Sequence, residues 1–296
     1  MRQEPEEIIC EPKAYLNELM MDDNSGQPSA KEVFDTTPYT ILVVDDNPDM
    51  TDFLKRTFEG YFKRIIIAGD GVEALQLVRS HVPDIIVSDV MMPRMNGYKL
   101  CKTIKEDINI SHIPVILLTA RDDRQSQISG YKNGADGYLS KPFEVEMLME
   151  LIRNRLKNRE YTKKRYLNAG LIPTPEESTI SLTDETFLIK LNSIIQENIE
   201  NSNLGIQFIC QEVGLGRSSL YNKLKALTGM GANEYISKLR IEKAITLISG
   251  TDMPFSEIAE KTGFTTPSYF STAFKQYTGE TPSQYKERKK KGLADK

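Results

Sequence analysis

Residues 41–46 read Ile-Leu-Val-Val-Asp-Asp, and residues 85–89 read Ile-Ile-Val-Ser-Asp. In each stretch a short apolar run is followed at once by acidic residues. Such short runs are consistent with strands that are buried on both faces of a parallel sheet. The two stretches therefore predict two buried strands with carboxylates at their C-terminal ends.

Similar apolar runs occur on either side of these two. They are residues 64–68, 115–119 and 137–139. Amphipathic segments separate the runs, and we expect helices at residues 48–60, 72–79, 98–106, 123–133 and 144–158. Five strands that alternate with five helices predict a doubly wound α/β domain with a five-stranded parallel sheet and right-handed crossovers.

The ends of the predicted strands carry the residues that suggest chemistry. Because parallel strands end at the same rim of a sheet, Asp45, Asp46 and Asp89 should converge there. Carboxylates this close are unfavourable without a cation, and Mg²⁺ prefers such oxygen ligands. Thr119 and Lys141 end or follow two further runs, so a hydroxyl and an ammonium group should reach the same rim.

Four motifs in order now resemble the receiver domain of response regulators, with its flavodoxin-like fold, over residues 39–158. They are residues 41–47, 88–97, 117–120 and 137–143. Asn96 departs from the family, which often has Asp there, but it lies in a turn before Gly97.

The resemblance implies a role for each residue of the rim. Asp89 would accept a phosphoryl group from a phosphohistidine, and Thr119 and Lys141 would contact the phosphoryl oxygens. Tyr138 would be the aromatic side chain that reorients. The oxygen ligands of Mg²⁺ would be Asp45, Asp46, Asp89 and the backbone carbonyl of Met91.

The C-terminal part of the chain has no strand signals and reads as successive short helices. Residues 204–213 and 217–227 flank a glycine-containing turn, as do residues 255–261 and 267–277. A long helix at 233–248 joins the two units. We therefore expect an all-α domain with two helix-turn-helix units, whose second helices could enter successive major grooves about 34 Å apart.

Polar residues on the second helix of each unit are candidates for DNA contacts. They are Arg217, Ser218, Ser219, Asn222, Lys225, Thr266, Ser268, Thr272 and Lys275. Aromatic residues at this spacing are more often core residues, which we expect for Tyr221, Tyr269, Phe270 and Phe274, although either tyrosine could reach a phosphate.

Residues 187–290 resemble the AraC-type DNA-binding domain. The motifs are residues 258–264, 268–275 and 279–285, and Ala232 departs from the family, which often has Pro. Receiver and AraC-type domain in this order resemble the C-terminal output half of a hybrid two-component regulator. That resemblance implies a histidine kinase as phosphodonor, which could precede the receiver on a longer polypeptide.

Charge divides the chain in the same way. Residues 1–38 carry a net charge of −6 and are predicted to be an acidic leader with one short helix around residues 15–20. Residues 159–186 contain Pro173 and Pro175 and are predicted to be a linker. Residues 187–296 carry +4, of which 291–296 are a predicted tail. The overall charge of −4 hides this basic part, which suits DNA.

Several other classes are excluded. No apolar run has the roughly 20 residues of a membrane helix, and the acidic N-terminus is no signal peptide. Cys10, Cys101 and Cys210 form no CxxC pair, so we expect a reducing, cytoplasmic location. His81 and His112 read as loop residues, so the chain should hold no kinase and be no enzyme beyond its own phosphotransfer.

Three functions remain to be compared. The first is a transcription regulator that phosphorylation switches. The second is a DNA-binding protein whose receiver is an interaction module indifferent to phosphate. The third is a Mg²⁺-dependent phosphohydrolase, which Asp45-Asp46 disfavours because such enzymes need DxD after the first strand. For the first we also expect a homodimer on repeated DNA half-sites. Its interface would involve the apolar stripe Met147, Leu148, Leu151, Ile152 and Leu156.

Overall fold

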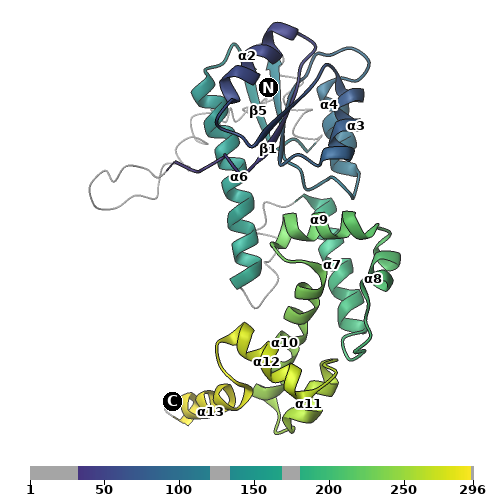
Figure 1. The fold of residues 1–296 in the computed structure, drawn as a ribbon, viewed down its shortest axis with the longest axis vertical. Helices are drawn as coiled ribbons and strands as arrows, with labels where there is room; N and C mark the ends of the chain where they lie inside the picture. The colour runs from purple at the N-terminus through teal and green to yellow at the C-terminus, as the bar shows by residue number, and fades with distance from the viewer. Residues whose placement is uncertain (1–32, 121–133, 169–180, 295–296) are drawn as a thin grey trace, which may run out of the picture. The chain divides into compact units, whose positions relative to one another are not determined.

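The computed structural model describes residues 33–120, 134–168 and 181–294, with only the backbone described at 165–168 and 290–294. Its sheet has five parallel strands in the order β2-β1-β3-β4-β5 (Figure 1). The strands are β1 (Thr40–Val44), β2 (Arg64–Ala68), β3 (Ile85–Asp89), β4 (Val115–Ala120) and β5 (Gly137–Lys141). The predicted strands are therefore confirmed to within two residues at each end, and so is the doubly wound sheet.

Helices cover both faces of the sheet. Helices α3 (Gly71–His81) and α4 (Gly97–Glu106) lie on one face, and α2 (Pro48–Phe58) and α6 (Val145–Asn168) lie on the other (Figure 1). One core cluster joins β1, β3 and β4 to α3 and α4 through side chains such as Leu42, Ile86 and Leu100. The predicted helix at 123–133 and the short helix at 15–20 lie outside the described residues.

The first turns of the helices near the acidic rim are capped by side chains. Asn47 accepts a hydrogen bond from the Asp49 amide, Asp70 from the Val72 and Glu73 amides, and Asn96 from the Lys99 amide. These bonds satisfy amide groups that have no partner within the helix. A polar residue in the loop after each of β1, β2 and β3 therefore caps the helix that follows.

The segment predicted as a linker at 159–186 is helical at both ends. Helix α6 continues through Asn168, and α7 begins at Leu182. The apolar stripe on α6 packs inward, because Leu148, Ile152 and Leu156 are fully buried, whereas Met147 is exposed. Three of the five residues of this stripe, including the last, are therefore used for packing within the chain.

Residues 182–294 form seven helices. They are α7 (Leu182–Glu197), α8 (Ile206–Val213), α9 (Arg217–Thr228), α10 (Ala232–Gly250), α11 (Phe255–Lys261), α12 (Pro267–Thr278) and α13 (Pro282–Ala294). Helix α13 thus continues into the predicted tail at 291–296. Two cores form along α10: its first half packs with α7, α8 and α9, and its second half with α11, α12 and α13. The prediction of two helix-turn-helix units on one connecting helix is confirmed.

None of the helices in the described parts of the chain combines the length and the apolar character that a membrane span requires.

Candidate functional site

The acidic rim forms where β1 and β3 end. Asp45 follows β1 directly and Asp89 is the last residue of β3, and both are buried. Lys141, the last residue of β5, places its Nζ 2.9 Å from an Asp45 carboxylate oxygen and 2.6 Å from an Asp89 oxygen. The structure therefore brings three of the predicted site residues into direct contact, although they are up to 96 positions apart in the chain.

Local backbone contacts fix the two carboxylates. One oxygen of Asp45 accepts a hydrogen bond from the Asn47 amide, and one oxygen of Asp89 accepts a bond from the Met91 amide, each at 2.9 Å. Gly97 is needed beside them, because a Cβ atom at this position would lie 2.2 Å from the Asp89 carbonyl oxygen. The Asn96-Gly97 turn thus allows the loop after β3 to return close to its own strand.

Burial shapes the protonation of this cluster. It raises the pKa of Asp89 above its ordinary value, and Lys141 only partly opposes this effect. For Lys141, burial acts to lower the pKa, but the hydrogen bonds and charges of Asp89 and Asp45 outweigh it and raise the pKa. Lys141 is therefore positively charged at neutral pH, and it partly neutralises the two carboxylates.

Thr119 and Tyr138 complete the predicted set. Thr119 is fully buried near the end of β4, and its hydroxyl has no hydrogen-bond partner among the described residues. A buried polar group without a partner is costly, so a ligand with acceptor oxygens would satisfy it. Tyr138 lies on β5, is half-buried, and packs against the core cluster of the sheet.

The predicted metal ligands are only partly assembled. Asp46 and Met91 are exposed, and within the described ranges no three His, Cys, Asp or Glu side chains meet in one metal-binding group. The chemistry of the donors still fits Mg²⁺, because the rim offers only hard oxygen ligands. Asp46, next to Asp45 in the chain, would have to turn toward it to join the group.

The predicted DNA contacts lie on the second helix of each helix-turn-helix unit, except Thr266, which is the N-cap residue of α12. All nine residues are at least partly accessible, and eight of them are exposed, with Ser219 half-buried. Arg217 donates a hydrogen bond to Gln207 of α8 at 3.0 Å, which links the two helices of the first unit. Gly263 shapes the turn of the second unit, since its positive φ and a Cβ contact of 2.2 Å with the Ile199 carbonyl would both disfavour a side chain.

The aromatic residues of these helices divide into two pairs. Phe270 and Phe274 are fully buried, as expected for core residues. Tyr221 and Tyr269 are each 54% exposed, so the prediction that they are core residues is wrong. Their neighbours Leu220 and Phe270 fill the core positions instead, and both tyrosines are available at the surface.

The sequence analysis missed a buried polar cluster. Lys223 of α9 has no exposed surface, forms an ion pair with Asp184 of α7, and donates a hydrogen bond to Ser111 Oγ at 2.8 Å. Ser111 in turn donates to Asp184 at 2.7 Å. The sequence gives no local signal that this lysine is buried, because its partners Asp184 and Ser111 lie 39 and 112 positions away in the chain.

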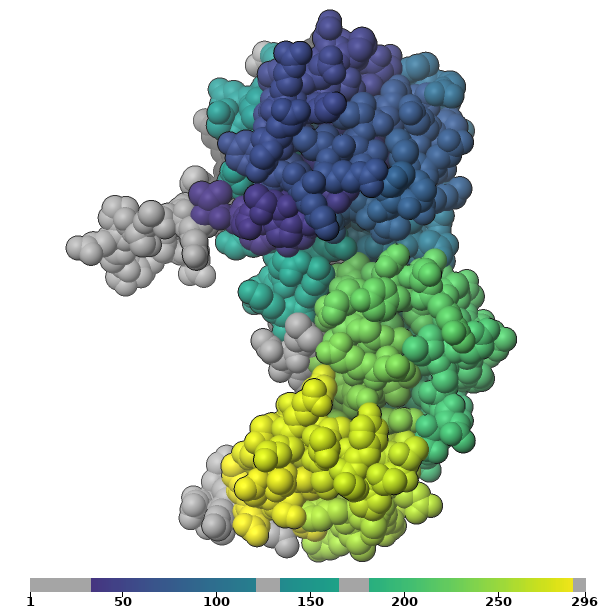
Figure 2. Space-filling view, in the orientation of Figure 1, coloured from purple at the N-terminus to yellow at the C-terminus, as the bar shows by residue number. Residues whose placement is uncertain are grey.

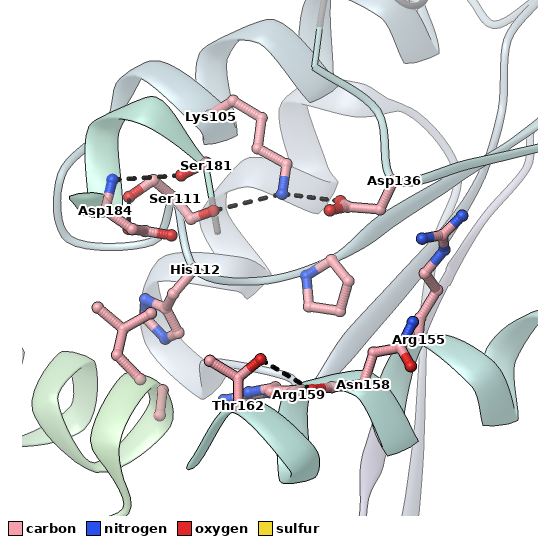
Figure 3. A pocket seen from close by; sticks show the side chains of 13 residues that line it. Lys105, Ser111, His112, Asp136, Arg155, Asn158, Arg159, Thr162, Ser181 and Asp184 are labelled. Atoms are coloured by element: carbon pink, nitrogen blue, oxygen red, sulfur yellow. Dashed lines mark hydrogen bonds and ion pairs between the residues drawn. The ribbon is translucent and has the colours of Figure 1, made fainter. Parts of the chain in front are cut away.

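A cavity of about 80 Å³ adjoins this cluster, and Figure 3 shows side chains from both halves of the chain around it. His112 lines the cavity, is only 8% exposed, and its Nδ1 atom has no partner among the described residues. The prediction that His112 lies in a loop is confirmed, but its burial was not predicted. His81 ends α3 and lies 2.8 Å from Ser80 Oγ.

Comparisons with known proteins find a known domain in the N-terminal part of the chain and another in the C-terminal part. The family model of the response regulator receiver domain matches residues 41–153, and the model of a helix-turn-helix domain matches residues 209–288. Response regulator MprA of Mycobacterium sp. (strain KMS) is 36% identical over 165 residues, which cover 51% of this chain and 70% of that protein. The chain belongs to the response regulators.

Two further proteins are similar to parts of this chain. Histidine kinase P4 of Formosa agariphila is 41% identical over 249 residues, which cover 84% of this response regulator but only 18% of that protein. A putative response regulator from Chloroflexus aurantiacus, known from a crystal structure, aligns with 41% of this chain and 99% of its own, at 34% identity and a TM-score of 0.39.

Proposed function

We propose that this response regulator changes its DNA binding when Asp89 accepts a phosphoryl group from a phosphohistidine. The observation that carries the proposal is the contact of Lys141 with both Asp45 and Asp89 beside the unpartnered hydroxyl of Thr119. An Asp89 oxygen would attack phosphorus, the P–N bond would break, and the imidazole of the donor would leave.

The neighbours of Asp89 would then exchange partners. A phosphoryl group brings nearly two negative charges and three acceptor oxygens. Lys141, which now pairs with two carboxylates, would turn to these oxygens, and the Thr119 hydroxyl would donate to one of them. Tyr138, next to the core on β5, is the aromatic residue that would change its orientation. This is a two-state equilibrium that a local charge shifts.

A divalent cation fits the same rim. Asp45, Asp46, Asp89 and the backbone carbonyl of Met91 would hold Mg²⁺, which when bound would offset the negative charge of the carboxylates and the phosphoryl oxygens. Asp45 is already fixed by the Asn47 amide, so its oxygen is oriented before any ion arrives.

The output would be sequence-specific binding of DNA and regulation of transcription. Nine residues of α9, of α12 and of the α12 N-cap are accessible for base edges and phosphates: Arg217, Ser218, Ser219, Asn222, Lys225, Thr266, Ser268, Thr272 and Lys275. We infer that a phosphorylated homodimer would place these helices on repeated half-sites. A histidine kinase would be the phosphodonor, either as a separate protein or on a longer polypeptide.

The functional division of the chain follows the same proposal. Residues 39–158 would act as the receiver and residues 187–290 as the AraC-type DNA-binding domain, with an acidic leader at 1–38 and a tail after 290. A cytoplasmic location is supported by the two free, buried cysteines among the described residues, Cys101 and Cys210.

A phosphotransfer experiment tests the proposal. The full chain is incubated with a ³²P-phosphorylated histidine donor and Mg²⁺, and label on the protein is measured over time. We expect Asp89→Asn to abolish the uptake of label, because the acceptor oxygen is lost. The matched control is Asp52→Asn, which changes an exposed carboxylate of α2 and should label like the unaltered protein. Undiminished labelling of Asp89→Asn would contradict the assignment.

A further inference from the structure

Most residues that line the cavity of about 80 Å³ are polar. One row of them lies on a single face of α6, at positions i, i+3, i+4 and i+7: Arg155, Asn158, Arg159 and Thr162. Figure 3 shows this row along one side of the cavity and Lys105 with Asp136 along the other. The polar lining thus comes mainly from α6 and from the segments around α4 and β5.

Positive charge predominates in this lining. Its charged residues are three cations and two carboxylates: Lys105, Arg155, Arg159, Asp136 and Asp184. Both carboxylates already have cationic partners, since Lys105 Nζ lies 2.7 Å from an Asp136 oxygen and Asp184 pairs with the buried Lys223. The charges of the two arginines are therefore not matched by carboxylates of the lining.

Three nitrogen atoms around the cavity lack hydrogen-bond partners among the described residues. They are His112 Nδ1, Arg155 Nε and Arg159 Nε. The His112 side chain is almost fully buried, and Arg159 donates to the Asp84 carbonyl at 3.1 Å through a terminal nitrogen, which leaves its Nε atom unused. Because buried polar groups are nearly always hydrogen-bonded, these three atoms point to a ligand that brings acceptor oxygens.

The surroundings of His112 show the same excess of positive charge. Burial is the main cause that lowers its pKa to about 3, and the charges of Arg159, Lys223 and Lys105 lower it further. The carboxylate of Asp184 acts in the opposite direction. An anion beside these groups would be attracted by three cations, and it would make the protonated imidazole less unfavourable.

Apolar residues cover a further side of the cavity. Ala226 and Leu227 of α9 line it, and α9 packs against α6. Figure 2 shows atoms of these two regions, green and teal, in contact. Since the effective dielectric constant is lower where water is scarce, the cations attract a bound ion more strongly here than on an open surface.

We propose that this cavity binds a small oxyanion of the size of phosphate, held by Arg155, Arg159 and His112. One water molecule needs about 10–15 Å³ of such a volume. A cavity of about 80 Å³ therefore has room for a tetrahedral ion but not for a nucleotide. Arginine suits this ligand, because its planar guanidinium group presents several N–H donors in the geometry that oxyanions accept.

The cavity is separate from the acidic rim. His112 precedes β4 (Val115–Ala120), whereas Asp89 is the last residue of the neighbouring parallel strand β3, so the two sites lie at opposite edges of the sheet. The rim presents carboxylates and suits a divalent cation, whereas the cavity presents cations and needs no metal to attract an anion. The proposal therefore does not rest on the phosphorylation of Asp89.

Nuclear magnetic resonance of the histidine rings tests the site in the full chain. The chain has two histidines, so ¹⁵N-labelled histidine gives two sets of ring signals, and His112→Gln assigns them through the loss of one set. Phosphate is added at pH 7 without Mg²⁺, and chloride keeps the ionic strength constant. We expect the His112 signals to shift with half-saturation at about 1 mM phosphate or below. The signals of the exposed His81 should stay in place.

Three variants locate the binding on α6. Arg155→Gln removes a charge and a donor, so the Kd for phosphate should rise by about tenfold or more. Arg155→Lys keeps the charge but loses the Nε donor, and about a threefold rise is expected. The matched control is Lys157→Gln, which makes the same charge change at an exposed position of α6 and should bind like the unaltered protein. Circular dichroism and the His81 signals verify that each variant is folded.

Each outcome decides for or against the site. His112 signals that do not move up to about 10 mM phosphate, or that move equally with chloride, would overturn it. So would equal affinities of the Arg155→Gln and Lys157→Gln variants. Sulfate, which has the same tetrahedral shape, should bind within about tenfold of phosphate, and failure of sulfate to bind would overturn the proposed ligand class. A failure of Asp89 to take up a phosphoryl group would leave all these results unaffected.

Discussion

Helices α9 and α12 are two copies of one element. Both have 12 residues and end at a glycine in the left-handed conformation, Gly229 and Gly279. An offset of 50 positions aligns them: Leu220 with Phe270 and Leu224 with Phe274 fill the two cores, and Lys225 with Lys275 are exposed.

The two copies differ on their remaining face. Position 223 of α9 is a fully buried lysine, whereas its counterpart in α12 is the half-buried Ala273. Helix α9 therefore packs on its own core and on the receiver, whereas α12 packs on α10, α11 and α13. The comparison teaches that two helices with the same length and the same core pattern can differ in what covers their remaining face.

The largest effect should come from removing the buried charge that distinguishes α9. Lys223→Ala leaves the Asp184 carboxylate buried without its partner, and such losses cost about 3–5 kcal/mol. Lys225→Ala, at an exposed position of the same helix, should change the free energy of unfolding by less than about 0.5 kcal/mol. Urea unfolding followed by circular dichroism checks both, and equal stability of the two variants would remove the distinction between the faces of α9.

Acid should destabilise the surroundings of α9 through His112, which lines a cavity together with Ala226 and Leu227 of that helix. Burial, with the charges of Arg159 and Lys223, lowers the pKa of His112 to about 3. Between that pH and its ordinary pKa of about 6.5, only the unfolded chain binds the proton, so the free energy of unfolding should fall with falling pH, by up to about 1.4 kcal/mol per pH unit.

His112→Gln should remove this part of the acid sensitivity, whereas His81→Gln, at an exposed position, should retain it. Unfolding free energies measured from pH 7 to pH 4.5 give the slopes. Hydrogen exchange over the same range should increase in α9 earlier than in α12. A His112→Gln variant with the slope of the unaltered protein would show that this imidazole is not excluded from water.

A smaller effect concerns the first turns of the two helices. Thr266 caps α12 by accepting a hydrogen bond from the Tyr269 amide, whereas Gly216 at the same place in α9 offers no side chain. Thr266→Ala should lower the stability of the second core by about 1 kcal/mol, and Gly216→Ser should raise that of the first by a few tenths of a kcal/mol. Thermal unfolding of the two variants measures both changes, and a shift of the same sign in both would contradict the capping difference.

The smallest expected difference lies between the matched lysines. If Lys225 and Lys275 contact DNA phosphates, replacing either with Ala should weaken binding to all sequences and reduce the slope of log Kd against log salt by about one. Fluorescence anisotropy at several salt concentrations measures the slope. An unchanged slope for Lys275→Ala alone would show that only the first unit engages the backbone of DNA.

The sequence predicted most of this structure because its signals are local. Apolar runs that end on Asp45 and Asp89 mark strands and a rim at once, and the turns at Gly214 and Gly263 mark two helical units. The acidic rim follows from the rule that parallel strands end on one edge, and Lys141 is found by the same rule.

What the sequence did not predict depends on contacts between distant segments. The burial of Lys223 requires Asp184 and Ser111, and no periodicity reports such a partnership. The loop position of His112 was predicted, but its burial was not, because residues of α6 and α9 line the cavity around it. Tyr221 was expected in the core, although Leu220 already fills that position. A comparison of the two helix copies offers one usable signal, since a lysine stands where the other copy has Ala273.

The central claim is that a phosphoryl group on Asp89 controls the binding of DNA, and operator affinity tests it most directly. Binding of the full chain to its operator is measured by anisotropy with Mg²⁺, with and without beryllofluoride as a mimic of the phosphoryl group, for the unaltered protein and for Asp89→Asn. We expect the mimic to change the affinity of the unaltered protein by about fivefold or more and to leave that of Asp89→Asn unchanged. The same affinity for the unaltered protein in both conditions would contradict the claim and favour a receiver that is indifferent to phosphate.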